Sequence, residues 1–169
     1  MEYFQQSPLQ TKIYKLFLQK IPMEKTLVLI KPDAMVKKLA GNVISELYNA
    51  GLKMIGLKLV NVKRELAEQH YNEHKGKPFF EKLIQHITGE LHGNENVIAI
   101  AYEGEDAIQK IRTAAGKTHP EEAEYSTIRG KYGRHVSSTD CFENVIHASD
   151  SPKSGEREIY LWFDEDELI

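Results

Sequence analysis

Cysteine and long apolar runs are the two features that this sequence most plainly lacks. Cys141 is the single cysteine among 169 residues, which excludes an intramolecular disulfide and suits a reducing compartment. No apolar stretch approaches the roughly 18 residues of a membrane-spanning helix, and the N-terminal segment has no secretory apolar core. We therefore predict a cytoplasmic protein without a membrane partner.

An excess of charge of one sign is also absent. The chain carries 22 Lys and Arg residues against 25 Asp and Glu residues, a formal net charge of −3. Without a global basic field, nucleic-acid binding is not expected, although a local basic pocket for a phosphate stays open. The hydrophobic content of 41% and the charged content of 28% are typical of a globular domain that buries a core.

The hydrophobic pattern predicts an α+β fold. Four segments have the composition or alternation of strands: 25–31, 52–63, 96–102 and 158–163. Four others have helical spacing: 40–51, 64–74, 79–87 and 105–116. This order predicts a ferredoxin-like sandwich, in which helices cover one face of a four-stranded, mostly antiparallel sheet. The segment from about 117 to 146 has little periodicity and is long enough to be a functional loop.

These elements lie within residues 24–169, which we predict to form one domain. Residues 1–23 are predicted to be a separate N-terminal extension. It is expected to be helical, because Leu9, Ile13, Leu16 and Phe17 share one helical face. Such a helix would pack on the domain or on a neighbouring subunit.

Two short motifs indicate other kinds of site, and both are weak. His70 and His74, with Glu73, match the H-x-x-E-H pattern of a zinc site, but no third ligand is evident. The segment AAGKTHP at 114–120 resembles the end of a phosphate-binding P-loop. The first glycine of that motif is missing, and the segment follows a helix rather than a strand.

The segment NVIHASDSPKSGERE at 144–158 places a histidine just before a helix start. Ser151 and Pro152 are residue types of an N-cap and a first helical position, so His147 would lie near the positive end of the helix dipole. That position favours a phosphate and disfavours a charged imidazole. Glu158, at the far end of this helix, could accept from one ring nitrogen and leave the other free to attack. These residues alone leave two hypotheses, a phosphoryl-accepting histidine and a polar helix cap.

Five blocks of the sequence resemble, in order, segments of the nucleoside diphosphate kinase family. They are TLVLIKPDAM (26–35), HYNEHKGKPFF (70–80), AYEGEDAI (101–108), STIRG (126–130) and NVIHASDSPKSGEREIYLWF (144–163). The resemblance implies a Mg²⁺-dependent transferase that moves the γ-phosphate of a nucleoside triphosphate, such as ATP or GTP, to a nucleoside diphosphate. The transfer would be ping-pong, through a phosphohistidine. The resemblance also implies self-association, usually to a hexamer and in some members to a tetramer.

The resemblance implies catalytic roles for residues in three of the blocks. His147 matches the nucleophile, which attacks through Nδ1. Glu158 matches the acid that orients the ring through the other nitrogen, and Ser149 matches the serine that bonds to this acid. Lys31 and Tyr71 match the pair that flanks the histidine and contacts the transferred phosphate and the sugar.

Nucleotide-binding roles are implied in the same way. Arg112, Thr118 and Arg129 match phosphate-binding groups, and Lys31 is shared with the catalytic set. Asn144 matches a residue that contacts a sugar hydroxyl. Phe79 matches the ring that stacks on the base, a contact that tolerates any base because every base has a π-face.

The sequence departs from the family pattern in two places. Ala148 follows the histidine, where many members have glycine, and residues 131–143 form a longer loop than the common form. The longer loop leaves the second wall of the base pocket unassigned. With the N-terminal extension, it motivates an alternative, a nucleotide-binding regulatory module with weak or no turnover. The intact set of site residues favours the enzyme.

Overall fold

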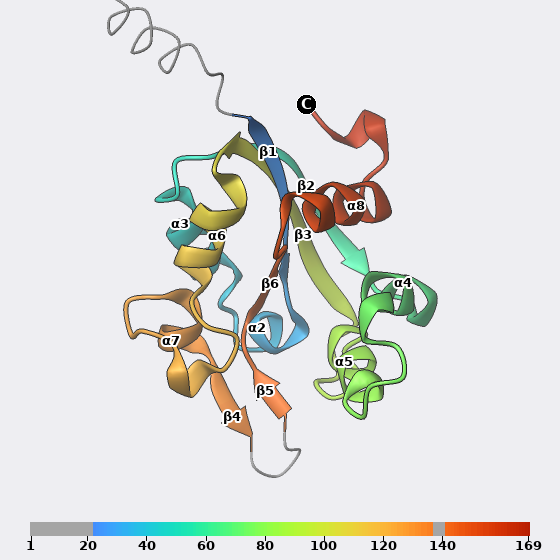
Figure 1. Ribbon diagram of the computed structural model, residues 1–169. Coiled ribbons are helices and arrows are strands. Elements are labelled where there is room, and N and C mark those ends of the chain that lie inside the picture. Colours follow the sequence, from blue (N-terminus) through green and yellow to red (C-terminus); the bar gives the residue numbers. More distant parts are fainter. Residues whose placement is uncertain (1–21, 137–140) are drawn as a thin grey trace, which may run out of the picture.

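An antiparallel sheet of four strands forms the centre of the protein (Figure 1). The computed structural model describes residues 22–136 and 141–169, so almost all of the predicted extension at 1–23 lies outside the described residues. The strand order is β2 (Lys53–Asn61), β3 (Asn96–Glu105), β1 (Met23–Ile30) and β6 (Ile146–Ala148). All three neighbouring pairs are antiparallel, which confirms the predicted four-stranded sheet of a ferredoxin-like α+β fold.

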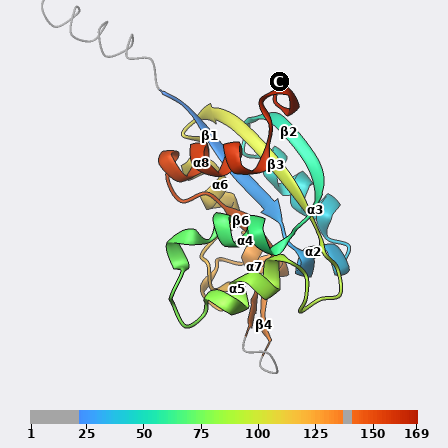
Figure 2. The same ribbon diagram turned by 90° about the vertical axis from the view of Figure 1, so that its right-hand side faces the viewer.

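Helices cover both faces of the sheet, so the prediction of a single covered face is wrong. On one face lie α2 (Pro32–Val36), α3 (Ala40–Tyr48), α6 (Ala107–Ala115) and α7 (Ile128–Tyr132). On the other lie α4 (Arg64–His70), α5 (Phe80–Ile87) and α8 (Pro152–Trp162) (Figure 2). The reason is visible in β1, where Leu27 and Leu29 enter one apolar cluster and Val28 and Ile30 enter the other. A run of consecutive apolar residues in a strand, as at 27–30, is typical of a sheet buried on both faces.

The predicted last strand at 158–163 is wrong, because these residues belong mostly to α8. Ser151 caps this helix, its side chain accepting from Ser154 N–H, and Pro152 takes the first position as the sequence predicted. The buried residues of α8 recur at helical spacing: Ser154, Gly155, Glu158, Ile159 and Trp162. The strand-like composition of EIYLWF was therefore overridden by the cap and by packing on β1. A Cβ at Gly155 would lie 2.2 Å from the carbonyl oxygen of Lys25, so only glycine permits this close approach.

The segment 117–146, predicted to be irregular, contains several short elements. These are a 3₁₀ turn at Pro120–Glu122, α7, the hairpin strands β4 (Arg134–Val136) and β5 (Cys141–Glu143), and the start of β6. Further 3₁₀ turns lie at Asn72–His74 and Glu165–Glu167. None of these elements exceeds five residues, which is too short for a periodic pattern to show.

Strand β6 places His147 at an edge of the sheet. It pairs with β1 through three residues, with His147 opposite Leu29, so the imidazole lies on the face that carries α8. Among the described residues, no helix has the length and apolar character needed to cross a bilayer.

Candidate active site

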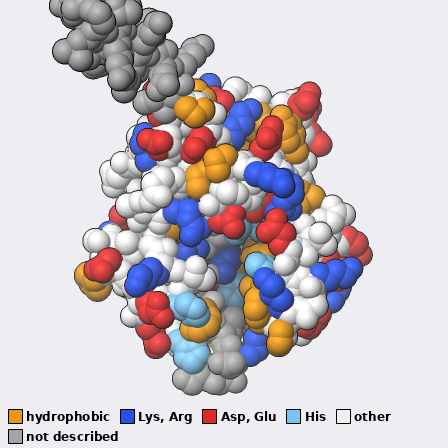
Figure 3. All heavy atoms as spheres, viewed as in Figure 1, with side chains coloured by type: hydrophobic (Ala, Val, Ile, Leu, Met, Phe, Trp, Pro, Cys, Tyr) orange, Lys and Arg blue, Asp and Glu red, His pale blue; other side chains and the backbone are white. Residues whose placement is uncertain are grey.

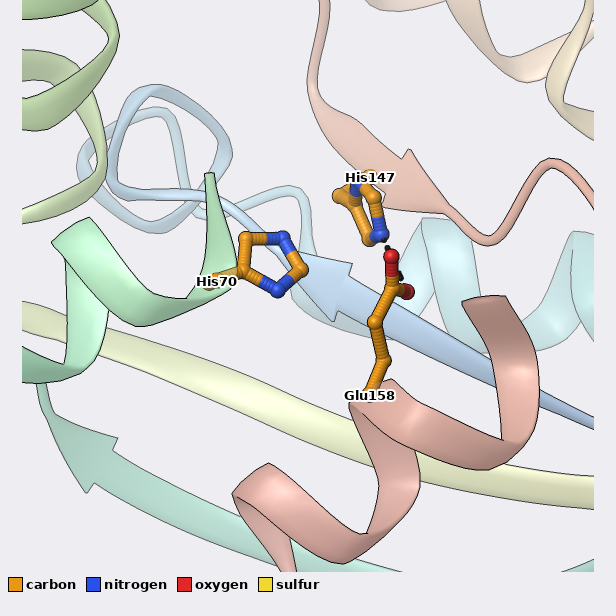
Figure 4. A group of neighbouring side chains, drawn as sticks. All are labelled: His70, His147 and Glu158. Carbon is orange, nitrogen blue, oxygen red and sulfur yellow. Dashed lines mark hydrogen bonds and ion pairs between the residues drawn. The ribbon is translucent and has the colours of Figure 1, made fainter. Parts of the chain in front are cut away.

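Strand β6 and helix α8 bring three of the predicted site residues into contact. Nε2 of His147 lies 2.8 Å from Oε2 of Glu158 (Figure 4). The hydroxyl of Ser149 donates to the same oxygen at 2.8 Å. A carboxylate can only accept, so this contact places the ring hydrogen on Nε2. Nδ1 then keeps its lone pair. Ser149 also accepts from Leu27 N–H at 3.0 Å, which ties the acid to β1.

A strained turn immediately precedes β6. Val145 has φ of 72°, in the left-handed region that a β-branched residue rarely adopts. The N–H of Ile146 donates to the carbonyl of Asn144 at 2.7 Å, which closes a γ-turn around Val145. Two further bonds hold it: Lys31 N–H donates to the Val145 carbonyl at 2.9 Å, and Val145 N–H donates to Oδ2 of Asp33 at 2.9 Å.

Asp33, in α2, is fully buried under this turn. Its Oδ1 lies 3.2 Å from Nε2 of His86, in α5. Burial alone would raise the pKa of Asp33, but the bonds from His86 and Val145 and the charge of Lys31 outweigh it and hold the pKa well below its usual range. Asp33 is therefore ionised at every ordinary pH. Burial lowers the pKa of His86 to about 4, so His86 is neutral above that pH.

Lys31 and Asn144 meet next to the nucleophile. The ammonium of Lys31 donates to Oδ1 of Asn144, and the amide of Asn144 donates to the carbonyl of Thr118 at 2.9 Å. The ring of Tyr71 stands nearly perpendicular to that of His147, with centroids 6.3 Å apart. Burial raises the pKa of Tyr71 above its usual range, so its hydroxyl stays a donor at neutral pH.

Two guanidinium groups add positive charge to the site. Arg129 is buried and donates to the carbonyls of Gly116 at 2.9 Å and Ile146 at 3.0 Å, while its Nε has no partner among the described residues. Burial and the nearby charge of Arg112 lower its pKa to about 10, so it remains a cation. Arg112 is exposed in α6. These two cations are neighbours, and carbonyl groups satisfy Arg129 only in part, so the pair is suited to hold phosphate.

The predicted base-stacking residue lies farther out. Phe79 is 48% exposed, its ring centroid lies 5.6 Å from that of His74, and the ammonium of Lys77 lies 5.7 Å above its face. Figure 3 shows Lys, Arg and His side chains on the floor of a hollow. In the shared view of Figures 1 and 3, α4 and α5 border this hollow on one side, and α7 with the β4–β5 hairpin on the other.

The structure thus gathers most of the predicted site residues and leaves three exposed. Direct contacts join His147 to Glu158 and Glu158 to Ser149, and a second set joins Lys31, Asn144 and the carbonyl of Thr118. The three exposed residues are Phe79, Arg112 and Thr118.

The zinc and P-loop motifs do not form the sites that their patterns predict. In the described part of the chain, the grouping with converging ligand atoms is His70, His147 and Glu158, which contains neither Glu73 nor His74. The segment 114–120 ends a helix at Gly116, with φ of 82°, whereas a P-loop begins one.

Sequence reasoning missed two contributors to the site. Asp33 lies inside a matching block, but nothing in the sequence links it to Val145, 112 residues away. His70 lies in the weak zinc motif, and no local signal places its ring 4.4 Å from that of His147.

Comparisons with known proteins support the resemblance. A family model described as nucleoside diphosphate kinase matches residues 24–168. The chain belongs to the nucleoside diphosphate kinase family. The nucleoside diphosphate kinase of Pyrococcus furiosus is 49% identical to this chain over 146 residues, which cover 86% of each chain. That of Thermococcus kodakarensis is 49% identical over 147 residues, covering 87% of this chain and 80% of the relative.

Solved nucleoside diphosphate kinases share the fold. The halophilic enzyme from Halobacterium salinarum, solved in complex with CDP, superposes with a TM-score of 0.78 at 41% identity, covering 88% of this chain and 92% of the other. The enzyme from Borrelia burgdorferi was solved as a transition-state mimic with bound vanadate and ADP. It superposes with a TM-score of 0.78 at 32% identity, covering 87% of this chain and 90% of the other.

Proposed function

We propose that this protein is a nucleoside diphosphate kinase whose phosphoryl carrier is His147. In the first half-reaction, Nδ1 forms a bond to the γ-phosphorus of a nucleoside triphosphate while the bond to the bridging oxygen breaks, and the diphosphate leaves. In the second, a terminal oxygen of another diphosphate attacks the phosphohistidine and the N–P bond breaks. The contact between Nε2 of His147 and Glu158 carries the proposal, because it leaves Nδ1 free and gives the developing positive charge a carboxylate partner.

The other predicted residues take binding roles in this proposal. Lys31 and Tyr71 contact the transferred phosphate, and Asn144 holds a sugar hydroxyl. Arg112, Thr118 and Arg129 bind phosphate oxygens, which agrees with the adjacency of the two guanidinium groups. Phosphoryl transfer depends mainly on positioning and charge neutralisation, and these residues supply both.

The predicted cofactor, Mg²⁺, is part of the same proposal. Kinases of this family generally need a divalent metal ion. The buried carboxylates beside the nucleophile are already engaged, Glu158 with His147 and Ser149, and Asp33 with Val145 and His86. The ion is therefore expected to bind through the nucleotide phosphates and water, as Mg²⁺ commonly does, and to neutralise charge there.

Self-association is also proposed, to a hexamer, with a tetramer as the alternative. Strand β2 is an edge of the sheet, and its Leu57 and Leu59 are 51% and 63% exposed. An apolar edge strand is a surface on which a second copy can pair. Light scattering coupled to gel filtration measures the state, and a monomeric Leu59→Lys variant is expected if β2 forms the contact. The predicted cytoplasmic location belongs to this proposal too and fits the single cysteine.

Phosphohistidine formation tests the proposed activity directly. After incubation with γ-labelled ATP and Mg²⁺, the protein is expected to carry a label that is labile to acid and stable to alkali. His147→Ala should carry none, and its turnover of several diphosphates should fall by at least about 10³-fold. His135→Ala, a change of a partly exposed histidine on β4, is the matched control and should keep the label. Nucleotide binding without label or turnover in the wild type would reject the enzyme and favour a binding module.

A further inference from the structure

A second histidine lies against the proposed nucleophile. His70, the last residue of α4, is 3% exposed. Its ring centroid lies 4.4 Å from that of His147, at an interplanar angle of 79°, so its edge meets the face of the other ring. One nitrogen of His70, one nitrogen of His147 and a carboxylate oxygen of Glu158 all lie within 4.8 Å of one another (Figure 4).

Trp162 fixes the tautomer of His70. The indole N–H of Trp162, in α8, donates to Nδ1 of His70 at 3.2 Å. An indole nitrogen has no acceptor capacity, so Nδ1 must be unprotonated, and the neutral ring carries its hydrogen on Nε2. Burial holds the pKa of His70 well below its usual range, and this keeps the ring neutral.

The N–H at Nε2 of His70 contributes no hydrogen bond to the described part of the fold. This nitrogen is buried and has no hydrogen-bond partner among the described residues. An unpaired buried N–H is unfavourable, so its persistence beside a reactive ring calls for a reason. In Figure 4 one nitrogen of His70 lies on the side of the ring toward His147, and the other is turned away from it.

We infer that His70 is a positioning residue for His147, and that Trp162 sets the tautomer with which it acts. The inference rests on the proposed function. Glu158 fixes a single atom of the His147 ring, which leaves the ring free to swing about that contact, because the terminal torsion of histidine is broad. The edge of His70 against the ring face removes this freedom. A ring edge bearing an N–H also attracts the electron-rich face of a neutral imidazole and repels an imidazolium, so it favours the form that attacks.

The hydrogen bonds favour this role over a cation site at the same atoms. A metal ion there would displace the hydrogen on Nε2 of His70. It would also displace the two hydrogens that Glu158 accepts, from His147 and Ser149. The charged groups around His70 are two cations, Lys31 and Arg157, against the single carboxylate of Glu158, so they do not favour a further cation.

Three variants separate positioning from packing. His70→Phe keeps a ring edge but has no nitrogen, and His70→Gln keeps an N–H donor near the position of Nε2. Trp162→Phe removes the donor that fixes the tautomer and frees Nδ1 to bind a proton. For each variant, kcat, KM, the pH profile of His147 phosphorylation and the free energy of unfolding are measured on the full chain.

We expect His70→Phe to lower kcat by about tenfold or more while KM changes less than about twofold, as for other groups that orient a reactive ligand. His70→Gln should recover most of that loss. Trp162→Phe should also lower kcat, because neutral His70 can then carry its hydrogen on Nδ1 and turn an unprotonated Nε2 toward His147. The chain has one tryptophan, so the indole N–H gives a single nuclear magnetic resonance peak, which should shift when His147 is phosphorylated.

The inference is overturned if His70→Phe keeps kcat within about twofold of the wild type. It is equally overturned if both His70 variants lose activity only in proportion to their loss of stability, with the wild-type pH profile. A wild-type protein that forms no phosphohistidine is a different result, because it rejects the proposed function itself.

Discussion

His147 is held from two sides, and the two supports use different chemistry. On the α8 side, Glu158, Ser149 and His70 contact or approach the imidazole; we call them the ring support. On the α2 side, Asp33 and His86 hold the backbone turn at Val145; we call them the turn support. The ring support sets where a proton and a lone pair lie. The turn support sets where the strand begins and leaves the ring untouched.

This difference separates activity from stability. A side chain that touches the reacting ring influences the transition state, whereas one that holds a strained backbone chiefly influences the folded state. Substitutions in the ring support should therefore lower kcat with little loss of stability, and substitutions in the turn support should do the reverse. The predictions below test this separation, from the largest expected effect to the smallest.

Removing the carboxylate of the ring support should have the largest effect. We expect Glu158→Ala to lower kcat by about 10³-fold, roughly 4 kcal/mol of barrier, because the ring loses both its orientation and the partner for its positive charge. KM should change less than about threefold. A coupled spectrophotometric assay measures both constants. Glu156→Ala, an exposed change in the same helix, is the control, and a loss below tenfold in Glu158→Ala contradicts the role.

Removing the carboxylate of the turn support should act on stability. We expect Asp33→Ala to lower the free energy of unfolding by about 3 kcal/mol, because Val145 N–H and the ring of His86 lose their buried acceptor. Equilibrium unfolding in guanidinium chloride gives the value. Asp166→Ala, on the exposed surface, should stay within about 0.5 kcal/mol of the wild type. A loss below about 1 kcal/mol in Asp33→Ala would show that the turn does not depend on it.

The turn support should also make stability depend on pH. The pKa of His86 falls to about 4 in the folded state, against about 6.5 when unfolded, so between these values the unfolded chain binds the extra proton. The contribution is complete above pH 6.5 and is lost as the pH falls, by about 2 kcal/mol between pH 7 and pH 5. Unfolding at the two pH values measures it. His86→Gln, which keeps a donor to Asp33, should lose less on acidification, and an equal loss would exclude His86 as the source.

Removing the hydroxyl of Ser149, which supports Glu158 rather than His147 directly, should have the smallest effect. Ser149→Ala removes one donor to Glu158 and leaves the contact from His147 in place. We expect kcat to fall about fivefold, corresponding to about 1 kcal/mol for one hydrogen bond. The same coupled assay applies. A loss as large as that of Glu158→Ala would show that the serine, rather than the acid, orients the ring.

The parts of the fold that follow from local pattern were predictable, and the rest depends on distant contacts. Strands β1, β2 and β3 and helices α3 to α6 are long enough for their apolar periods to appear. Strand β6 has three residues, and only its pairing with β1 makes it a strand. Helix α8 reads as a strand from Glu158 onward, because its branched and aromatic residues favour strands until the Ser151 cap is taken into account.

The candidate site divides in the same way. The motif around His147 and the family blocks indicated which residues would contact the phosphates, sugar and base of a nucleotide. They could not predict Asp33 or His70, whose significance lies in one bond or one ring contact across the fold. The charge on Asp33 depends on His86, Val145 and Lys31, and the tautomer of His70 depends on the donor from Trp162. No sequence pattern expresses such contacts between distant residues.

The pairing of β6 with β1 also dictates when the site can exist. The bonds that complete it join residues far apart in the chain: Asp33 to Val145 at a separation of 112, Lys31 to Asn144 at 113, and Leu27 to Ser149 at 122. Contacts of such separation form late, because closing the long intervening loop costs conformational entropy before the contacts can stabilise the fold. A nascent chain that ends before Asn144 therefore exposes one edge of β1 and has no reactive histidine. Synthesis of β6 covers this edge of β1 and supplies the histidine, and the site is complete once α8 adds Glu158.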